Sequence, residues 1–362
     1  MKIVFPILVC LLLSYAVEAK VTPMPASTTA AKTFSQHVSK RIPSIAAIIV
    51  EQHGIRSCEE YYHGAMASTE FDVKSVTKTI VSAIAGAAKL RGLLPNLDTP
   101  FLDVMPEYRS PNRNGPHIWF AEIGGEDYDD FLEDDSLRNI LTLRQLLQMQ
   151  PGFKYNDFGE TSGELCWASD PIRFMIDLPF EHPPGDTFTY CTGASVMFGA
   201  ALSKVVGTDL KTFADTALFS LCGMTVNRWA TDPQGRRLGG SELFCRASDL
   251  LALGELYLHH GMSNGKQVLT REWVEESVAK HAELNHWDVA PNVNGYGYYW
   301  WRRTSHSHQI YYASGYGGQL ICVIPDLDMV IVTICTLGKN NRGRSELHRL
   351  HECIDEMIGH LK

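Results

Sequence analysis

The sequence predicts a mixed α/β (α+β) fold in which both termini form one central antiparallel sheet with flanking helices, and a mainly helical subdomain is inserted between them. Three observations predict it. Runs of apolar, β-branched residues bounded by turn residues occur near the N-terminus, similar runs return near the C-terminus, and the chain between them has helical periodicity. A chain of 362 residues, 45% of them hydrophobic and 20% charged, has the composition of a folded globular protein.

The N-terminal part begins with a segment rich in Ala, Thr, Ser and Pro, residues 20–40, which we expect to be a loose arm. Residues 44–54 and 58–64 then predict the two strands of a hairpin, because apolar and β-branched residues are bounded by turn residues. At Ser75 the pattern becomes helical, and a glycine and a proline end this helix before residue 96. A hairpin therefore precedes the helix that begins at Ser75.

Helices dominate the middle of the chain. One begins with the capping pair Thr142 and Gln145 and ends before Pro151. Four more segments have helical periodicity: 194–207, 209–219, 248–261 and 270–280. Residues 122–135 contain eight acidic residues and no basic residue, and we interpret them as a solvated loop, with a lid or a partner-binding loop as the alternative.

The C-terminal part returns to strands, predicted over 295–303, 308–315, 319–325 and 328–335, and ends in an amphipathic helix over 345–361. Strands at both ends of the chain indicate a single domain over residues 20–362. Its α/β part covers about 41–95 and 290–362, and its helical part covers about 96–289.

Charge and the N-terminus restrict partners and location. A formal net charge of -9 provides no basic surface for nucleic acid or anionic lipid. Met1-Lys2, an apolar run of about 11 residues, and Val17-Glu18-Ala19 predict a signal peptide over residues 1–19, cleaved after Ala19. We therefore expect a secreted or periplasmic protein without a membrane span in the mature chain, and an uncleaved anchor is the alternative. The sequence does not predict the oligomeric state.

The cysteines and histidines indicate no metal site or cofactor. Removal of the signal peptide leaves eight cysteines, whose pairing the sequence leaves open. None of their spacings is C-x-x-C, and the close histidine pairs lack carboxylates or cysteines at ligand spacing. No H-E-x-x-H motif occurs.

The most informative short motif is S-x-x-K, which occurs three times, at Ser75-Lys78, Ser263-Lys266 and Ser277-Lys280. The second copy lies in a glycine-containing turn, and flanking glutamates make the third lysine an ordinary surface charge. Only Ser75 begins a helix that stays apolar for two turns after the lysine. This copy is therefore the candidate for a nucleophile and its base.

Residues three apart on a helix share a face, so Lys78 Nζ can reach Ser75 Oγ. Burial would lower the pKa of Lys78 and make it a usable general base, while the helix N-terminus would stabilise an anion near Ser75. The alternative is a capping serine beside a lysine that extends to solvent, and the stretch alone does not decide between them. A second proton carrier and an oxyanion hole are also needed. Tyr190 directly precedes a helix, and the glycine-rich segment 313–318 allows a close backbone approach.

These motifs, in this order, resemble those of a known family. Ser75-Val76-Thr77-Lys78, Tyr190-Cys191-Thr192 and Ala313-Ser314-Gly315 are similar to the S-x-x-K, Y-x-N and K-T-G series of the serine β-lactamase and penicillin-binding-protein superfamily, specifically its class C β-lactamase-related hydrolases. The segments "TLRQLLQMQPGF", "PPGDTFTY" and "GYGGQ" are similar to surrounding parts of that family. The resemblance covers roughly residues 45–334 and implies the β-lactamase/DD-peptidase-like fold.

The resemblance also implies roles for single residues. Ser75 would be the acylated nucleophile, Lys78 its base, and Tyr190 the proton carrier for the leaving group. Backbone N–H groups of Ser75 and Tyr316 would form the oxyanion hole. Thr192, Ser314 and Gly315 would contact the substrate, a small-molecule ester or amide, and no cofactor or metal would be needed.

Two departures from the family pattern bear on the substrate. Thr192 replaces the usual Asn or Ser, which keeps a hydroxyl that can bond Lys78 but loses an amide that holds a substrate carbonyl. Ala313 replaces the Lys or His that pairs with the carboxylate of a β-lactam or of a D-Ala terminus. Loss of such a charge-assisted hydrogen bond weakens binding by roughly 1.5 to 3 kcal/mol. We therefore expect an esterase or amidase.

Several alternatives follow. One is a β-lactamase or an enzyme that processes D-Ala peptides, and another is an inactive binding homologue, although Ser75, Lys78 and Tyr190 are all intact. A G-x-S-x-G elbow, which would favour the α/β-hydrolase fold, does not occur. Cys191, beside Tyr190, is interpreted as a small buried residue rather than a reactive thiol.

Overall fold

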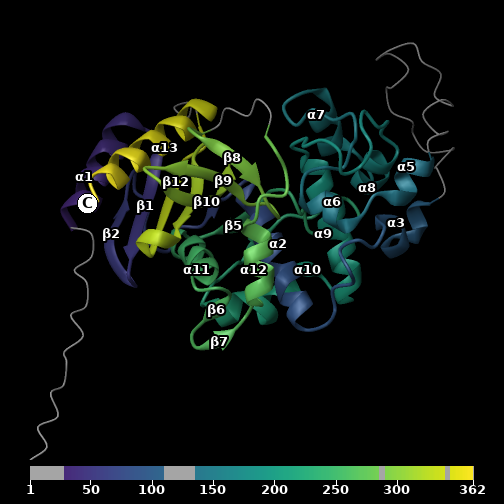
Figure 1. Cartoon of the computed structure of the whole chain (residues 1–362), viewed down its shortest axis with the longest axis horizontal. Coiled ribbons are helices and arrows are strands. Elements are labelled where there is room, and N and C mark those ends of the chain that lie inside the picture. The colour runs from purple at the N-terminus through teal and green to yellow at the C-terminus, as the bar shows by residue number, and fades with distance from the viewer. Residues whose placement is uncertain (1–27, 110–134, 285–289, 339–342, 362) are drawn as a thin grey trace, which may run out of the picture.

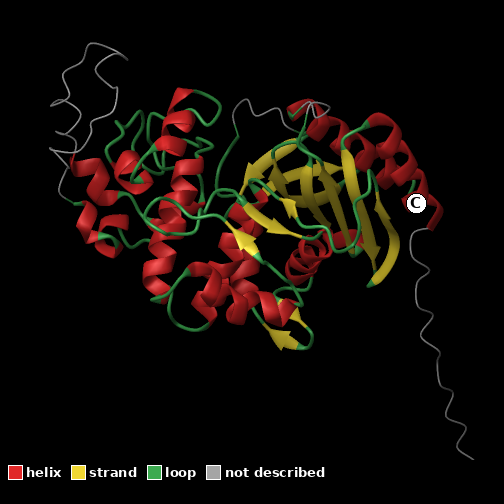
Figure 2. Ribbon diagram, turned by 180° about the vertical axis from the view of Figure 1, so that it is seen from behind, coloured by secondary structure: helices red, strands yellow, loops and turns green. Residues whose placement is uncertain are grey.

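The two ends of the chain build one seven-stranded antiparallel sheet in the computed structural model, which describes residues 28–109, 135–284, 290–338 and 343–361 (Figures 1 and 2). The strands lie in the order β2-β1-β12-β11-β10-β9-β8. Their bounds are β1 Ile45–Gln52, β2 Ile55–Tyr61, β8 Val293–Tyr296, β9 Trp301–Ser305, β10 His308–Gly315, β11 Gln319–Ile324 and β12 Met329–Cys335. The predicted sheet formed by both termini is confirmed.

Helices cover both faces of this sheet. On one face α13 (Arg344–Gly359) packs beside α1 (Thr28–Arg41), and His351 of α13 contacts Tyr312 of β10. On the other face lie α2 (Val76–Leu90) and α11 (Ala247–Leu258), where Gly254 approaches Ile321 of β11. Tyr312 pairs with Cys322, so Ile321 points to the opposite face because successive strand residues alternate. The sheet is therefore the middle layer of three.

The prediction of a loose arm over residues 20–40 is wrong from Thr28 onward, because α1 begins there. Ala31, Phe34 and Val38 are each at most 3% exposed, and they lie at helical spacing on the face that contacts the sheet layer. Their apolar periodicity was masked by the Ala- and Thr-rich composition of the segment. Burial of this narrow apolar face against the rest of the fold therefore stabilises the helix α1.

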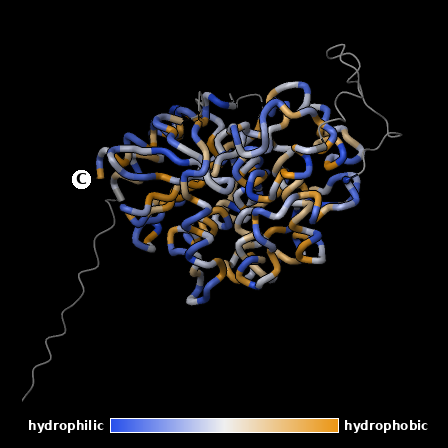
Figure 3. Tube along the Cα trace, turned by 45° about the vertical axis from the view of Figure 1, so that its right-hand side comes forward, coloured by the Kyte–Doolittle hydropathy of each residue, from blue (hydrophilic) through white to orange (hydrophobic). Residues whose placement is uncertain are grey.

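The segment between the N-terminal and C-terminal strands is mainly helical, as predicted. Its helices are α3 (Phe101–Val104), α5 (Asp135–Ile140), α6 (Leu143–Leu147), α7 (Glu160–Trp167), α8 (Pro171–Ile176), α9 (Thr192–Val206), α10 (Leu210–Ala214) and α12 (Arg271–Val278), in addition to α11. The predicted capping box is present, with Thr142 and Gln145 bonded reciprocally at the start of α6. Hydrophobic and hydrophilic stretches alternate along the helices, as expected when one face of each lies in the core (Figure 3).

Two small sheets besides the seven-stranded one were not predicted. One joins β3 (Phe71–Asp72), β5 (Leu243–Cys245) and β4 (Arg228–Trp229), and the other is the hairpin of β6 (Met262–Ser263) and β7 (Lys266–Gln267). Strands of two or three residues carry too little periodicity to be recognised in a sequence. The hairpin contains the second S-x-x-K copy, so that lysine is not on a helix, as expected.

Other expectations fall partly or wholly outside the described residues. The signal peptide lies outside them, and so does the acidic segment except for Asp135, the first residue of α5. The eight cysteines from Cys58 to Cys353 are unpaired, and Cys166 is the exposed one among them. Within the described ranges, no helix is both long and apolar enough to cross a membrane, and no group of three or more His, Cys, Asp or Glu residues could hold a metal ion.

Candidate active site

Ser75 and Lys78 are in direct contact at the start of α2. The Lys78 ammonium donates a hydrogen bond to Ser75 Oγ at 2.9 Å and another to the backbone carbonyl of Gly240 at 2.8 Å. Ser75 occupies the N-cap position, but its side chain makes no capping hydrogen bond, and Lys78 is only 1% exposed. The alternative interpretation, a capping serine beside a lysine that extends to solvent, therefore does not describe this pair.

Burial changes the chemistry of Lys78. The side chain lies inside the protein, which penalises the charged form and lowers the pKa of Lys78 to about 8. The negative charge of Asp157 opposes part of this shift. A lysine with such a pKa is neutral in a useful fraction of molecules near neutral pH, and a neutral amine accepts a proton.

The turn before α2 holds Ser75 in place. Lys74 has a φ of 50°, a left-handed conformation that is uncommon outside glycine. Its N–H donates to Asp72 Oδ1 at 3.0 Å, and its side chain bonds Glu242 at 2.8 Å. On the helix itself, Gly86 allows Trp273 to pack closely, since a Cβ there would lie 2.4 Å from the indole. Ser75 is therefore fixed by a hydrogen-bonded turn before it and a tightly packed helix after it.

Tyr190 lies beside this pair, just before α9. Its ring centroid is 5.1 Å from Lys78 Nζ, and its hydroxyl is hydrogen-bonded to Ser75. The ring stacks on Trp301 of β9 with centroids 5.4 Å apart. Burial, and secondarily the charge of Asp157, raise the pKa of Tyr190 far above its ordinary value, so the phenol keeps its proton and can donate it.

The end of β10 forms the opposite wall. A cavity of about 110 Å³ is lined by Ser75, Tyr190, Ser314, Gly315 and Tyr316, among others. Gly315 is required there by close packing, because a Cβ at this position would lie 2.4 Å from the carbonyl oxygen of Val73, two residues before Ser75. The structure thus brings together, in one cavity, five of the residues that the sequence predicted as site residues.

Thr192 and Ala313 are placed differently. Thr192 is not among the residues that line the cavity, and its N–H donates to Asp157 Oδ1 at 2.7 Å. Ala313 is fully buried and does not line the cavity, and an alanine at this position supplies no cation. The predicted contact of Thr192 with substrate stays a prediction.

Sequence reasoning missed several residues of the cavity. These are Asp157, Phe158, Trp301, Gly317, Gly343, Arg344 and Leu347. Asp157 and Phe158 lie in an irregular loop, and Arg344 is the first residue of α13, where nothing local distinguishes it from an ordinary surface arginine. Trp301 lies within the predicted strand over residues 295–303, whose run of Tyr and Trp was the one signal available for an aromatic wall.

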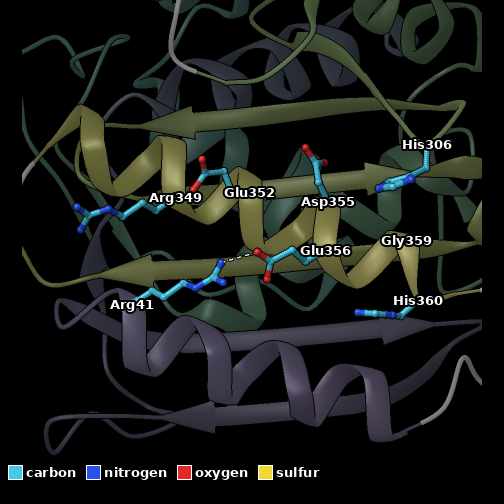
Figure 4. A pocket seen from close by; sticks show the side chains of 8 residues that line it. All are labelled: Arg41, His306, Arg349, Glu352, Asp355, Glu356, Gly359 and His360. Atoms are coloured by element: carbon cyan, nitrogen blue, oxygen red, sulfur yellow. Dashed lines mark hydrogen bonds and ion pairs between the residues drawn. The ribbon is translucent and has the colours of Figure 1, made fainter.

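A larger cavity lies elsewhere and lacks a nucleophile. It is an open depression of about 840 Å³ beside α13, and charged side chains and histidines from Arg41 to His360 line it. Figure 4 shows Arg41 and Glu356 pointing toward each other, and their ion pair is 2.6 Å long. Its lining residues include no serine beside a buried base, so the smaller cavity at Ser75 is the candidate active site.

Comparisons with known proteins agree with this geometry. A family model described as Beta-lactamase matches residues 28–355. Among solved structures, a putative 6-aminohexanoate-dimer hydrolase from Bacillus anthracis is 20% identical with a TM-score of 0.66, covering 91% of this chain and 80% of that chain. The hydrolase EstCE1, described as having promiscuous acyltransferase activity, is 16% identical with a TM-score of 0.69, covering 90% and 98%.

A third similar structure is the octameric penicillin-binding protein homologue from Pyrococcus abyssi, which is 15% identical with a TM-score of 0.64, covering 91% of this chain and 77% of that chain. At these identities the likeness shows a shared fold. A search of curated protein sequences finds no match.

Proposed function

Because this chain belongs to the beta-lactamase family, we propose that it is a secreted serine hydrolase that cleaves an ester or amide bond through an acyl-enzyme on Ser75. The observation that carries the proposal is the 2.9 Å hydrogen bond between Ser75 Oγ and the buried Lys78. A lysine with a lowered pKa beside a serine that does not cap its helix is the arrangement that nucleophilic catalysis needs.

In the acylation step, neutral Lys78 takes the proton of Ser75 Oγ as that oxygen attacks the substrate carbonyl. Backbone N–H groups of Ser75 and Tyr316 stabilise the oxyanion of the tetrahedral intermediate. Tyr190 then gives its proton to the departing alkoxide or amine, and the ester bond to Ser75 remains. Proton transfer from Lys78 to Tyr190 restores both groups, and water attacks the acyl-enzyme in the second half of the cycle with the same groups accepting its proton.

The wall provided by β10 favours esters and linear amides over β-lactams. A β-lactam carries a carboxylate that the family's Lys or His binds, and the buried Ala313 provides no cation at that position. Two proteins with the same fold are named a putative 6-aminohexanoate-dimer hydrolase and a hydrolase with promiscuous acyltransferase activity, and these names support the proposal of acyl transfer. A 6-aminohexanoate dimer is a linear amide, which is one of the two proposed substrate classes.

The decisive experiment is active-site labelling combined with a substrate panel. We expect a fluorophosphonate probe to add one adduct to the wild type by intact-mass spectrometry and none to Ser75→Ala. Ser277→Ala is the matched control from an inert S-x-x-K copy, since the Ser277 hydroxyl donates to the Trp273 carbonyl. A wild type that stays unlabelled would contradict the proposal.

In the same preparation, turnover of p-nitrophenyl esters and of a linear amide should exceed that of a chromogenic cephalosporin. Efficient cephalosporin hydrolysis would show that another cation replaces the one missing at Ala313, and the esterase or amidase assignment would then be wrong. Ser75→Ala should lose turnover of every substrate that the wild type hydrolyses.

Export of the protein is a separate proposal. Met1-Lys2, the apolar run and the cleavage site after Ala19 support a signal peptide. We expect protein recovered from the medium or the periplasm to begin at Lys20, as measured by N-terminal sequencing. Protein that begins at Met1 would contradict cleavage.

A further inference from the structure

A contact across the opening of the cavity joins two distant parts of the chain. Phe158 lies in the loop between α6 and α7, and Arg344 is the first residue of α13. The guanidinium carbon of Arg344 is 4.1 Å from the centroid of the Phe158 ring, which is a cation–π contact. Both residues line the same cavity as Ser75.

Exposure places this contact at the rim of the cavity. Phe158 is 55% exposed and Arg344 is also exposed, whereas Trp301 and Leu347 are 4% and 5% exposed. A cavity residue that is exposed to bulk solvent lies at the opening, and one that is buried lies at the floor. The Phe158–Arg344 contact therefore spans the opening from the helical part to the α13 side of the sheet.

Each partner is held by its own side of the opening. The Phe158 N–H donates to Asn156 Oδ1 at 3.0 Å, which fixes the loop locally. Gly343, directly before Arg344, packs against the Tyr316 ring, since a Cβ there would lie 2.7 Å from the Tyr316 hydroxyl. A cation–π contact at an exposed site favours the closed arrangement by only about two- to five-fold, so a ligand can displace it.

We propose that Phe158 and Arg344 are specificity-determining residues whose contact, hereafter the latch, narrows the opening so that Ser75 accepts small acyl groups in preference to long ones. This inference rests on the proposed function. The cavity beneath the latch encloses about 110 Å³, which leaves little room for a long chain while the contact is closed. A long acyl group must break the cation–π contact, whereas a small one fits beneath it.

The test compares kcat/KM for p-nitrophenyl octanoate with that for p-nitrophenyl acetate in the wild type, Phe158→Ala, Arg344→Ala and the double variant. We expect the octanoate-to-acetate ratio to rise about five-fold in each single variant and no further in the double variant, because both substitutions remove the same contact. The control is Trp167→Ala, since Trp167 is 89% exposed but does not line the cavity, and its ratio should equal that of the wild type.

An unchanged ratio in both single variants overturns the latch, and so does an equal rise in Trp167→Ala. A second measurement separates this outcome from failure of the proposed function. A double-mutant cycle on the free energy of unfolding should show coupling between Phe158 and Arg344 whether or not the protein turns over an ester. Wild type that hydrolyses neither ester and is not labelled at Ser75 contradicts the function, and absence of coupling contradicts the latch.

Discussion

Replacement of Lys78 by methionine is expected to lower kcat/KM for ester hydrolysis by about 10²- to 10⁴-fold, the usual contribution of a positioned general base. The wild-type kcat/KM should rise with pH through about 8, as Lys78 loses its proton, and the residual activity of the variant should lose this step. A variant that keeps wild-type activity would exclude Lys78 as the base.

The same substitution is expected to stabilise the fold at neutral pH. The folded-state pKa of Lys78, about 8, lies below its ordinary value of 10.5, so folding disfavours the charged form. This penalty is fully present below pH 8. It disappears as pH rises from 8 to 10.5, because Lys78 loses its proton at a lower pH in the folded state than in the unfolded state. Methionine should therefore raise the free energy of unfolding at pH 7 by about 1–2 kcal/mol, after the lost hydrogen bond to Gly240 offsets part of the gain.

Urea unfolding at pH 7 and at pH 10 measures this effect, and the gain should be smaller at pH 10. Lys280→Met provides a matched control, because Lys280 ends the inert Ser277 copy of the motif and its ammonium pairs with Glu283 at 2.7 Å. It should leave activity unchanged and stability within about 0.5 kcal/mol of wild type. An equal gain in the free energy of unfolding at both pH values would show that the folded state does not lower the pKa of Lys78.

Replacement of Tyr190 by phenylalanine should discriminate between leaving groups. The variant keeps the ring that stacks on Trp301 but loses the proton that the phenol holds. An amine cannot leave without a proton, whereas p-nitrophenolate leaves readily as an anion. We therefore expect kcat/KM for a linear amide to fall about 10²- to 10⁴-fold and that for a p-nitrophenyl ester to fall much less.

Tyr312→Phe is the control for this experiment, because Tyr312 also stacks on Trp301 and its buried hydroxyl has no hydrogen-bond partner among the described residues. Both substrates should be hydrolysed by this variant at wild-type rates. Equal losses on amide and ester in Tyr190→Phe would contradict proton donation to the leaving group and would indicate a role for Tyr190 in positioning Ser75.

The sequence predicted the parts of the fold and of the site that local patterns encode. Alternating or continuous apolar runs identified the strands at both ends, and a capping pair identified the start of α6. The pair Ser75 and Lys78 was recognisable because three residues of helix bring the two side chains together regardless of the rest of the fold.

Contacts between distant segments could not be predicted in the same way. The Gly240 carbonyl that binds Lys78 and the Asp157 carboxylate that influences both Lys78 and Tyr190 come from loops without regular periodicity. The latch joins residues 158 and 344, and neither position differs in sequence from an ordinary surface residue. The helix α1 was missed because its apolar face is narrow, and this face stabilises a helix only when it packs on the rest of the fold.

The pairing of β1 with β12 has a consequence for the order in which the protein matures. All eight residues of β1 are buried, and its partner strand begins only at Met329. During synthesis the edge of β1 that pairs with β12 therefore stays uncovered until nearly the whole chain has been made. Pairing between such distant segments is slow. Until then an apolar edge strand is open to other chains. A nascent chain has no completed cleft beside Ser75, so any acyl transfer begins only after the last strand has been made.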